Sequence, residues 1–169
     1  MKRLNIILFS LMTLAGSVGS YAHDFTATID GQRLYFNITN QASKTAEVTY
    51  KGSIADKLPN EISGTIEIPA KVKHDNVVYS ITAIGAKAFS NATKLNGIVM
   101  PSTINKIGDF AFACAYSINE LIIPDSVEEI GKSFLEEVLP DKIIVPANLV
   151  EIVKDRTESY YHNHIIVSE

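Results

Sequence analysis

The stretch Ile84-Gly85-Ala86-Lys87-Ala88-Phe89 decides the fold, because the same pattern returns twice further along the chain. The copies are residues 107–112 (IGDFAF) and 130–135 (IGKSFL), and each repeated isoleucine follows the previous one after 23 residues. A fixed period of about 20 to 50 residues is typical of solenoids, in which each unit buries its apolar face only against its neighbours. The sequence therefore predicts a stack of short coils that share one continuous core.

Each unit also contains a short apolar segment that ends at a proline. The segments are residues 66–68, 98–100, 121–123 and 143–145, and the prolines are Pro69, Pro101, Pro124 and Pro146. Alternation predicts a short strand, and proline ends the strand because it has no N–H to donate. The glycine after the repeated isoleucine predicts a turn, since glycine adopts backbone geometries that other residues resist. The phenylalanine that follows, as in Phe89 and Phe112, is expected to fill the interior.

The repeats decay toward both ends of the array, as terminal repeats of solenoids do. Upstream, Pro69 and Pro101 are 32 residues apart, which predicts an insertion over residues 73–79. Downstream, residues 145–153 continue the pattern, but Val153 stands where the glycine is expected. We expect the solenoid to span residues 64–154.

The two flanks of the array read as short β-structure. Residues 23–63 predict a β-hairpin cap, with an Asp30-Gly31 turn and strands over residues 34–38 and 46–50. Such a cap would cover the first strand edge, which could otherwise recruit another chain. Residues 155–169 predict a closing strand at the other end. The expected architecture is a short α/β solenoid of 23-residue units, each a β-strand plus a turn or short helix.

The first 22 residues have the composition of a secretory signal. Lys2 and Arg3 precede an apolar stretch over residues 6–15, and Ser20-Tyr21-Ala22 offers a cleavage site. We therefore expect an exported protein, secreted or held in the periplasm or at the cell surface, with no membrane insertion after cleavage. The single Cys114 excludes an intramolecular disulfide, and its alanine neighbours predict a small buried hydrophobic side chain.

Charge argues against two classes of partner. Without Lys2 and Arg3, the 15 basic residues of the chain fall to 13 against 19 acidic residues, a net charge of −6. Nucleic acids and anionic membrane surfaces both select basic patches, so we expect neither as a partner.

The string IPDSVEEIG, residues 123–131, resembles the BspA-type leucine-rich repeat family of secreted and surface bacterial proteins. Residues 76–85 are similar to the first repeat of many such proteins, and residues 46–50 to the strand that precedes their arrays. The resemblance implies a right-handed solenoid. It also implies adhesion or binding of host proteins for some members, and no known activity for most.

The residues that could carry catalysis do not form a recognisable pattern. His162 and His164 would share one face of a strand, and His23 would become the amino terminus after cleavage. These histidines are therefore conceivable ligands of a metal ion. The adjacent pairs Glu128-Glu129 and Glu136-Glu137 point in different directions, unlike the facing carboxylates of glycosidases. We predict no catalytic residue, no metal site and no cofactor, and keep a metal-dependent enzyme as a distant alternative.

The middle residue of each predicted strand should point away from the core. These residues are Glu67, Val99, Ile122 and Ile144, and three of the four are β-branched and apolar. A row of exposed aliphatic side chains is typical of a partner-binding surface, although strand propensity or a covering flank would also explain it. The sequence therefore predicts a non-catalytic, adhesion-type protein that binds an extracellular protein or glycan. The alternative is a structural or assembly module without a specific ligand, for which we keep self-association open.

Overall fold

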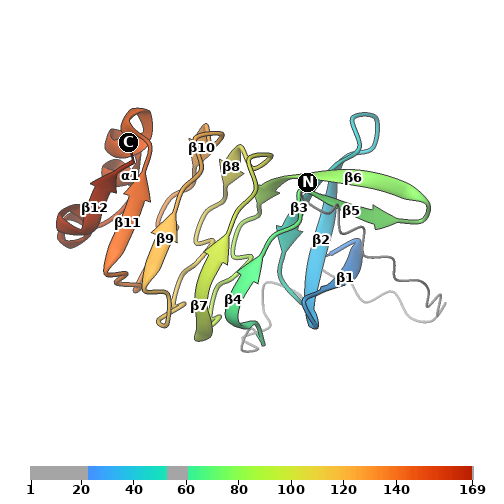
Figure 1. The fold of residues 1–169 in the computed structure, drawn as a ribbon, viewed down its shortest axis with the longest axis horizontal. Helices are drawn as coiled ribbons and strands as arrows, with labels where there is room; N and C mark the ends of the chain where they lie inside the picture. The colour runs from blue at the N-terminus through green and yellow to red at the C-terminus, as the bar shows by residue number, and fades with distance from the viewer. Residues whose placement is uncertain (1–22, 53–60, 169) are drawn as a thin grey trace, which may run out of the picture.

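The computed structural model describes residues 23–52 and 61–168, so the predicted signal over residues 1–22 lies outside the described part. One face of the molecule is a row of parallel strands from successive coils (Figure 1). In order along the row they are β4 (Ser63–Glu67), β7 (Lys94–Val99), β9 (Glu120–Ile122), β11 (Lys142–Val145) and β12 (Ile165–Val167). We call this row the strand face.

The ladder of the strand face is interrupted once. β4 pairs with β7, and β9 pairs with β11 and β11 with β12, in two separate sheets. Between them, β7 and β9 lie next to each other, and the amide of Asn119 donates to the Asn96 carbonyl over 3.5 Å. The predicted strands over residues 98–100, 121–123 and 143–145 thus lie side by side, although not in one continuous ladder.

A second row of strands carries the repeated isoleucines. It consists of β6 (Val77–Ile84), β8 (Lys106–Ile107) and β10 (Glu129–Ile130), which pair in parallel. Ile107 is the Cα partner of Ile84 on one side and of Ile130 on the other. Each coil up to β10 therefore contributes one strand to each row, and the chain is a repeat solenoid as predicted.

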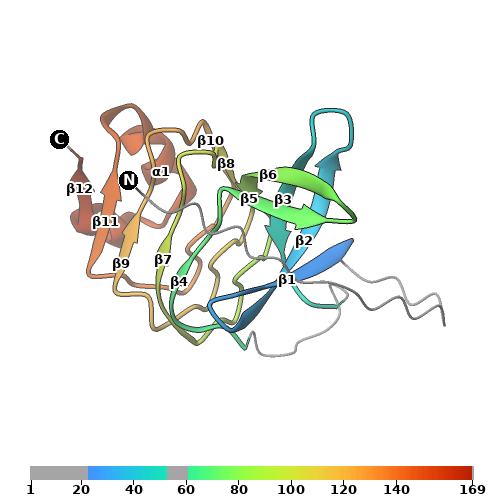
Figure 2. The ribbon, with the colours of Figure 1, turned by 45° about the vertical axis from the view of Figure 1, so that its right-hand side comes forward.

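The N-terminal segment extends the second row. β1 (Phe25–Ile29), β2 (Gln32–Asn40) and β3 (Thr45–Thr49) are antiparallel neighbours, and β3 pairs in parallel with β6 (Figure 2). The two turn residues Asp30 and Gly31 have φ values of 49° and 78°, as a tight hairpin with positive φ at both positions requires. Both strands predicted in this segment are present.

The predicted insertion is a second hairpin. β5 (Lys71–His74) pairs antiparallel with β6, and the turn between them is Asp75-Asn76, with φ values of 46° and 63°. The ribbon shows this hairpin projecting sideways from the stack of coils (Figure 1). The extra residues between Pro69 and Pro101 therefore leave the solenoid and return to it.

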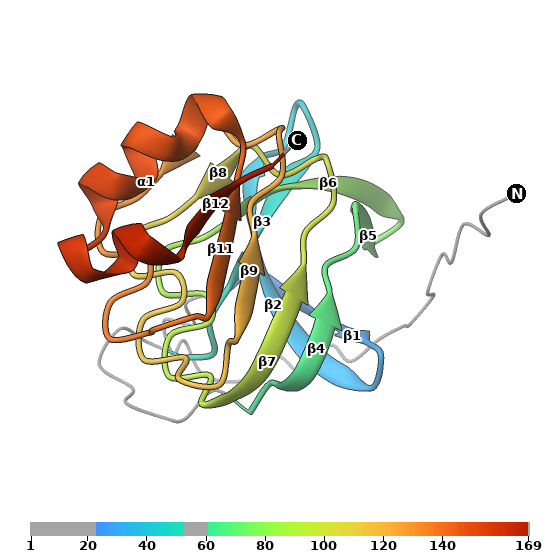
Figure 3. The same ribbon diagram turned by 60° about the vertical axis from the view of Figure 1, so that its left-hand side comes forward.

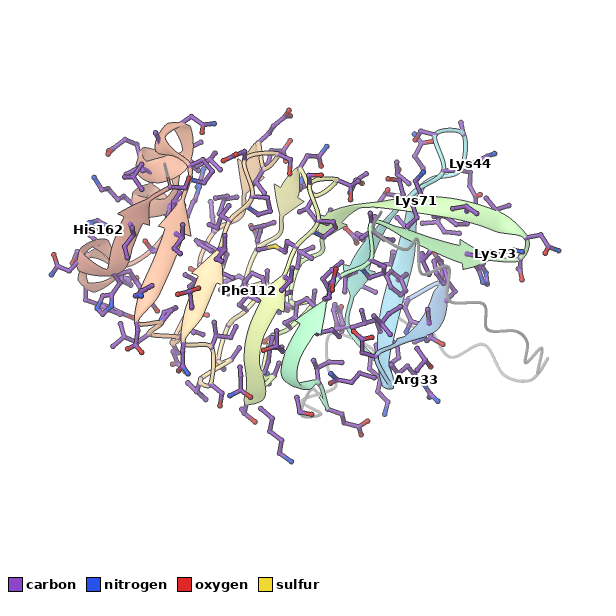
Figure 4. All side chains as sticks on the ribbon, in the orientation of Figure 1. Arg33, Lys44, Lys71, Lys73, Phe112 and His162 are labelled. Carbon is purple, nitrogen blue, oxygen red and sulfur yellow. The ribbon has the colours of Figure 1, made fainter. Side chains whose placement is uncertain are left out.

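The interior is a set of apolar columns running along the stack. The rings of Phe89 and Phe112 are nearly parallel, 6° apart, with centroids separated by 5.8 Å, and Phe134 is also fully buried. The two phenylalanines hold equivalent places on adjoining coils, as the repeat predicts. Figure 4 shows Phe112 in the middle of the stack.

The glycine of each repeat has a different role from the predicted turn. Gly85, Gly108 and Gly131 are not among the residues with positive φ, so they do not need glycine's conformational freedom. A Cβ at Gly108 would lie 2.5 Å from the Ala86 nitrogen, and one at Gly131 would lie 2.3 Å from the Asp109 nitrogen. Glycine is required because the backbones of consecutive coils touch there.

The left-handed residues of the coils lie after the glycine. Lys87, Phe110 and Ser133 form one such column and Asn91, Cys114 and Glu137 another, all with φ between 49° and 60°. Cys114 is thus a turn residue and is half-buried, so the predicted burial of its side chain is wrong. The turn geometry, which the alanines on either side do not reveal, directs the thiol outward.

The chain leaves the coil pattern after β11. It forms η1 (Ala147–Leu149), the helix α1 (Val150–Arg156) and η2 (Ser159–His164) before β12 rejoins the strand face (Figure 3). Residues 145–153 thus lead to a further strand of the strand face, as the pattern predicts, but they do so through helical turns in place of the turns of the earlier coils. Val153 has a side chain where the repeat needs none, and that side chain is the fully buried one of α1. Within the coils themselves, the described segments after each glycine are turns and not helices.

The Gly108→Ala substitution tests the close contact between coils. We expect a loss of about 1–3 kcal/mol or more in the free energy of unfolding, because the methyl group meets backbone that cannot move away cheaply. Urea denaturation measures it. Gly97→Ala is the matched control, since its Cβ would meet only the Thr65 side chain, at 3.2 Å. Equal losses in both variants would contradict the role assigned to Gly108.

The Phe112→Ala substitution tests the phenylalanine column. Phe112 is fully buried, so we expect the free energy of unfolding to fall by about 3–5 kcal/mol. Tyr116→Ala, at a side chain that is 59% exposed in the same coil, should change it by no more than about 0.5 kcal/mol. A small effect at Phe112 would mean that the phenylalanine rings contribute little to the stability of the core.

Candidate functional site

The predicted outward positions lie on the strand face. Val99 is 51% exposed and Ile122 is 50% exposed, Glu67 is exposed, and Ile144 is half-buried. On either side of Ile122, Leu121 and Ile123 are buried, so the strand alternates as a half-buried strand should. Within residues 23–52 and 61–168, neither flank covers Val99 or Ile122.

The exposed aliphatic side chains form a row across the strands. Ile122 is the Cα partner of Ile144, and Ile144 is the Cα partner of Ile166, which is 45% exposed. On the other side of the interruption, Val99 is the partner of Glu67. We call Val99, Ile122, Ile144 and Ile166 the aliphatic strip. Ile166 was missing from the prediction, although it follows Ile144 by the same 22-residue step that separates Ile144 from Ile122.

Charged groups border the aliphatic strip. Lys142 and Glu120 are Cα partners two residues before Ile144 and Ile122, so they point to the same face and both are exposed. Next to Val99, the corresponding positions are Gly97 and Thr65, which carry no charge. An apolar centre with a polar border is the usual anatomy of a surface that binds another molecule.

The histidines do not form the pair that a strand would give. His162 and His164 lie in η2, where a ring nitrogen of His162 is 3.1 Å from the Lys154 carbonyl and one of His164 is 3.3 Å from the Asp141 carbonyl. His23 packs against the Tyr35 ring, and burial lowers the pKa of its imidazole. Across residues 23–52 and 61–168, no three His, Cys, Asp or Glu side chains gather as metal ligands do.

The adjacent glutamates serve as surface groups. Glu129 forms an ion pair with Lys106 at 2.7 Å, and Glu137 accepts hydrogen bonds from the Tyr116 hydroxyl at 3.1 Å and the Cys114 thiol at 3.4 Å. Burial raises the pKa of the Cys114 thiol, which favours the protonated, less nucleophilic form. These contacts tie neighbouring coils together on the outside of the stack.

Comparison with known proteins gives the family. Residues 68–165 match the model described as "BspA type Leucine rich repeat region (6 copies)". The chain belongs to the BspA-type leucine-rich repeat family. Proteins of this family are surface repeat proteins and are generally not enzymes. A search of curated proteins finds no match.

Two solved structures illustrate the likeness of this BspA-type repeat protein to others. A leucine-rich repeat protein from Bacteroides ovatus ATCC 8483 is 22% identical with a TM-score of 0.51, covering 73% of this chain and 36% of that chain. A leucine rich cell surface protein from Faecalibacterium prausnitzii A2-165 is 24% identical with a TM-score of 0.46, covering 79% and 33%. The present chain thus spans about a third of the length of these two proteins. Among its described residues, no helix is both long and apolar enough to span a membrane.

Glu47 is a half-buried carboxylate on the second row of strands. It accepts a hydrogen bond from the Asn37 amide at 3.4 Å, and a Cβ on Gly85 would lie 2.9 Å from its carboxyl carbon. Burial is the main influence on its pKa, which is raised, while Asn37 and the charge of Lys106 oppose the shift. The folded protein therefore binds a proton on the Glu47 carboxylate more tightly than the unfolded chain does.

The Glu47→Gln substitution tests this carboxylate. A raised folded pKa means that stability falls as pH rises through the unfolded and then the folded pKa of Glu47. Glutamine does not ionise, so the variant avoids this loss. The free energy of unfolding of the variant minus that of wild type, measured by urea denaturation, should therefore be larger at pH 7 than at pH 4. Glu67→Gln, on the exposed strand face, is the control. The same difference between variant and wild type at both pH values would refute the assignment.

Proposed function

We propose that this protein binds an extracellular protein or glycan non-covalently through the aliphatic strip. The observation that carries the proposal is that Val99 and Ile122 stay about half exposed in a fold that buries their neighbours on each strand. Aliphatic groups of this kind gain free energy when a partner removes them from water, by about 25 cal/mol for each Å² buried. Glu67, Glu120 and Lys142 at the border would orient the partner by charge.

The location of the interaction follows from the leader. Residues 1–22 have the charge pattern and cleavage site of an export signal, so the strip would act outside the cytoplasm. An adhesion role for the whole protein, secreted or held at the surface, agrees with membership of a family of surface repeat proteins. No step of this function needs a cofactor or a catalytic residue.

The second candidate is an assembly module without a foreign ligand. β12 ends its sheet, and Ile166 and Val167 on it are 45% and 50% exposed. An edge strand with β-branched side chains and no Lys or Pro is open to pairing with another strand. Light scattering during size exclusion separates the candidates, because assembly gives a mass that rises with protein concentration and a monomeric binder does not.

The Ile122→Asp substitution tests the strip. We expect normal folding, because the side chain is half exposed, and at least about tenfold weaker binding to any partner captured by wild-type protein, since the buried carboxylate would be unpaired. Binding is measured by titration of the captured partner. Leu139→Asp is the matched control, at an aliphatic residue that is 59% exposed away from the strand face.

Two results would end this proposal. One is an Ile122→Asp variant that fails to fold, which would place the side chain in the core. The other is equal loss of binding in the Leu139→Asp control, which would make the effect one of net charge.

A further inference from the structure

We propose that the β5–β6 hairpin is a second binding site, separate from the aliphatic strip, and that it takes an anionic polysaccharide. Three exposed lysines gather at this site: Lys71 and Lys73 on β5 of the hairpin, and Lys44 in the neighbouring turn before β3 (Figure 4). Such a cluster is unexpected on a chain with more acidic than basic residues. We call Lys44, Lys71 and Lys73 the lysine patch.

The strand register places these three residues together. Lys71 and Lys73 are two residues apart on one strand, so they share a face, with Cα atoms about 7 Å apart. Ser80 on β6 is the Cα partner of Lys71, and its amide donates to the Lys44 carbonyl over 2.8 Å. Lys44 therefore lies two strands from Lys71, at about 10 Å.

The lysines are not neutralised by neighbouring carboxylates. Among the described residues, none of the three forms an ion pair, while the ion pairs that do occur involve other cations. Asp75 in the hairpin turn lies 3.3 Å from the His74 ring, on the opposite side of β5 from Lys71 and Lys73. The remaining side chains of the face are Val78, which is 48% exposed, and Ser80.

The shape and charge of the whole molecule select a thin anionic chain. One face of the hairpin packs against β1, where the His74 ring stacks on Phe25 at 4.4 Å, so Lys71 and Lys73 lie on its outer face, where a narrow polymer can reach them (Figure 1). The exposed carboxylates Glu136, Glu137, Asp155 and Glu158 lie at the other end of the solenoid, around α1 and the last turn. A flat anionic membrane would meet this net negative body as well as the patch. A polysaccharide with sulfate or carboxylate groups would meet the patch alone, with Val78 against its sugar rings.

Binding to defined polymers tests the site. The purified protein is titrated with heparin as a sulfated probe, polygalacturonate as a carboxylated probe and dextran as a neutral probe, at low ionic strength. We expect binding to one or both anionic probes, weakened by added salt, and none to dextran. The two anionic arms distinguish sulfate from carboxylate as the recognised group.

Two matched double variants locate the interaction. Lys71→Gln with Lys73→Gln should weaken binding at least about tenfold. Arg33→Gln with Lys94→Gln removes the same charge from two exposed cations outside both the lysine patch and the border of the aliphatic strip, and should leave affinity within about twofold. Figure 4 shows Arg33 at the opposite end of β2 from Lys44. Circular dichroism and urea denaturation confirm that both variants fold.

Three outcomes would overturn the proposal: no binding to either anionic polymer, equal losses in the two double variants, or tighter binding to phosphatidylserine vesicles than to the polymers. The Ile122→Asp variant should bind the polymers as wild type does. Because this variant alters only the aliphatic strip, its result separates a failure of the lysine-patch proposal from a failure of the proposed binding through the strip.

Discussion

The structure depends on how closely consecutive coils approach each other at the repeated glycine. At Gly108 and Gly131 the backbone of one coil occupies the space that a side chain of the next would need. This contact allows the Gly108 amide to donate to the Ile84 carbonyl at 2.8 Å, and the Gly131 amide to the Ile107 carbonyl at 2.7 Å. Hydroxyl groups add to these links, because Thr103 and Ser126 donate to the carbonyls of Ile81 and Ile104 in the coil before.

This close stacking fixes which side chains reach solvent. Two rows of strands and a column of phenylalanines fill the inside of each coil, so only alternate strand residues can face outward. The aliphatic strip exists because four of those outward positions carry Val or Ile. The lysine patch has a different origin, since Lys71 and Lys73 lie on a hairpin that the repeat did not generate and Lys44 lies in the turn before β3. Two surfaces of opposite chemistry can therefore act independently.

The end of the solenoid follows from the same constraint. Where Val153 replaces the glycine, another coil cannot approach as closely, and the chain covers the last coil with α1 and η2. The hydroxyl of Tyr161, buried in η2, donates to the Leu135 carbonyl at 2.6 Å and holds this cover against the last coil. β12 then continues the strand face and carries Ile166 into line with Ile144.

The sequence by itself determined the repeat, the strands that end at proline, the interior position of Phe89 and Phe112, and the outward direction of Val99 and Ile122. All of these follow from local periodicity, because identical units must stack in register. The tertiary structure alone decided the reason for the glycine, the outward turn at Cys114, the helix in place of a further coil, the addition of Ile166 to the strip, and the meeting of Lys44 with Lys71. Each of these depends on which backbone segments touch across the stack. The spacing of residues along the chain does not specify those contacts.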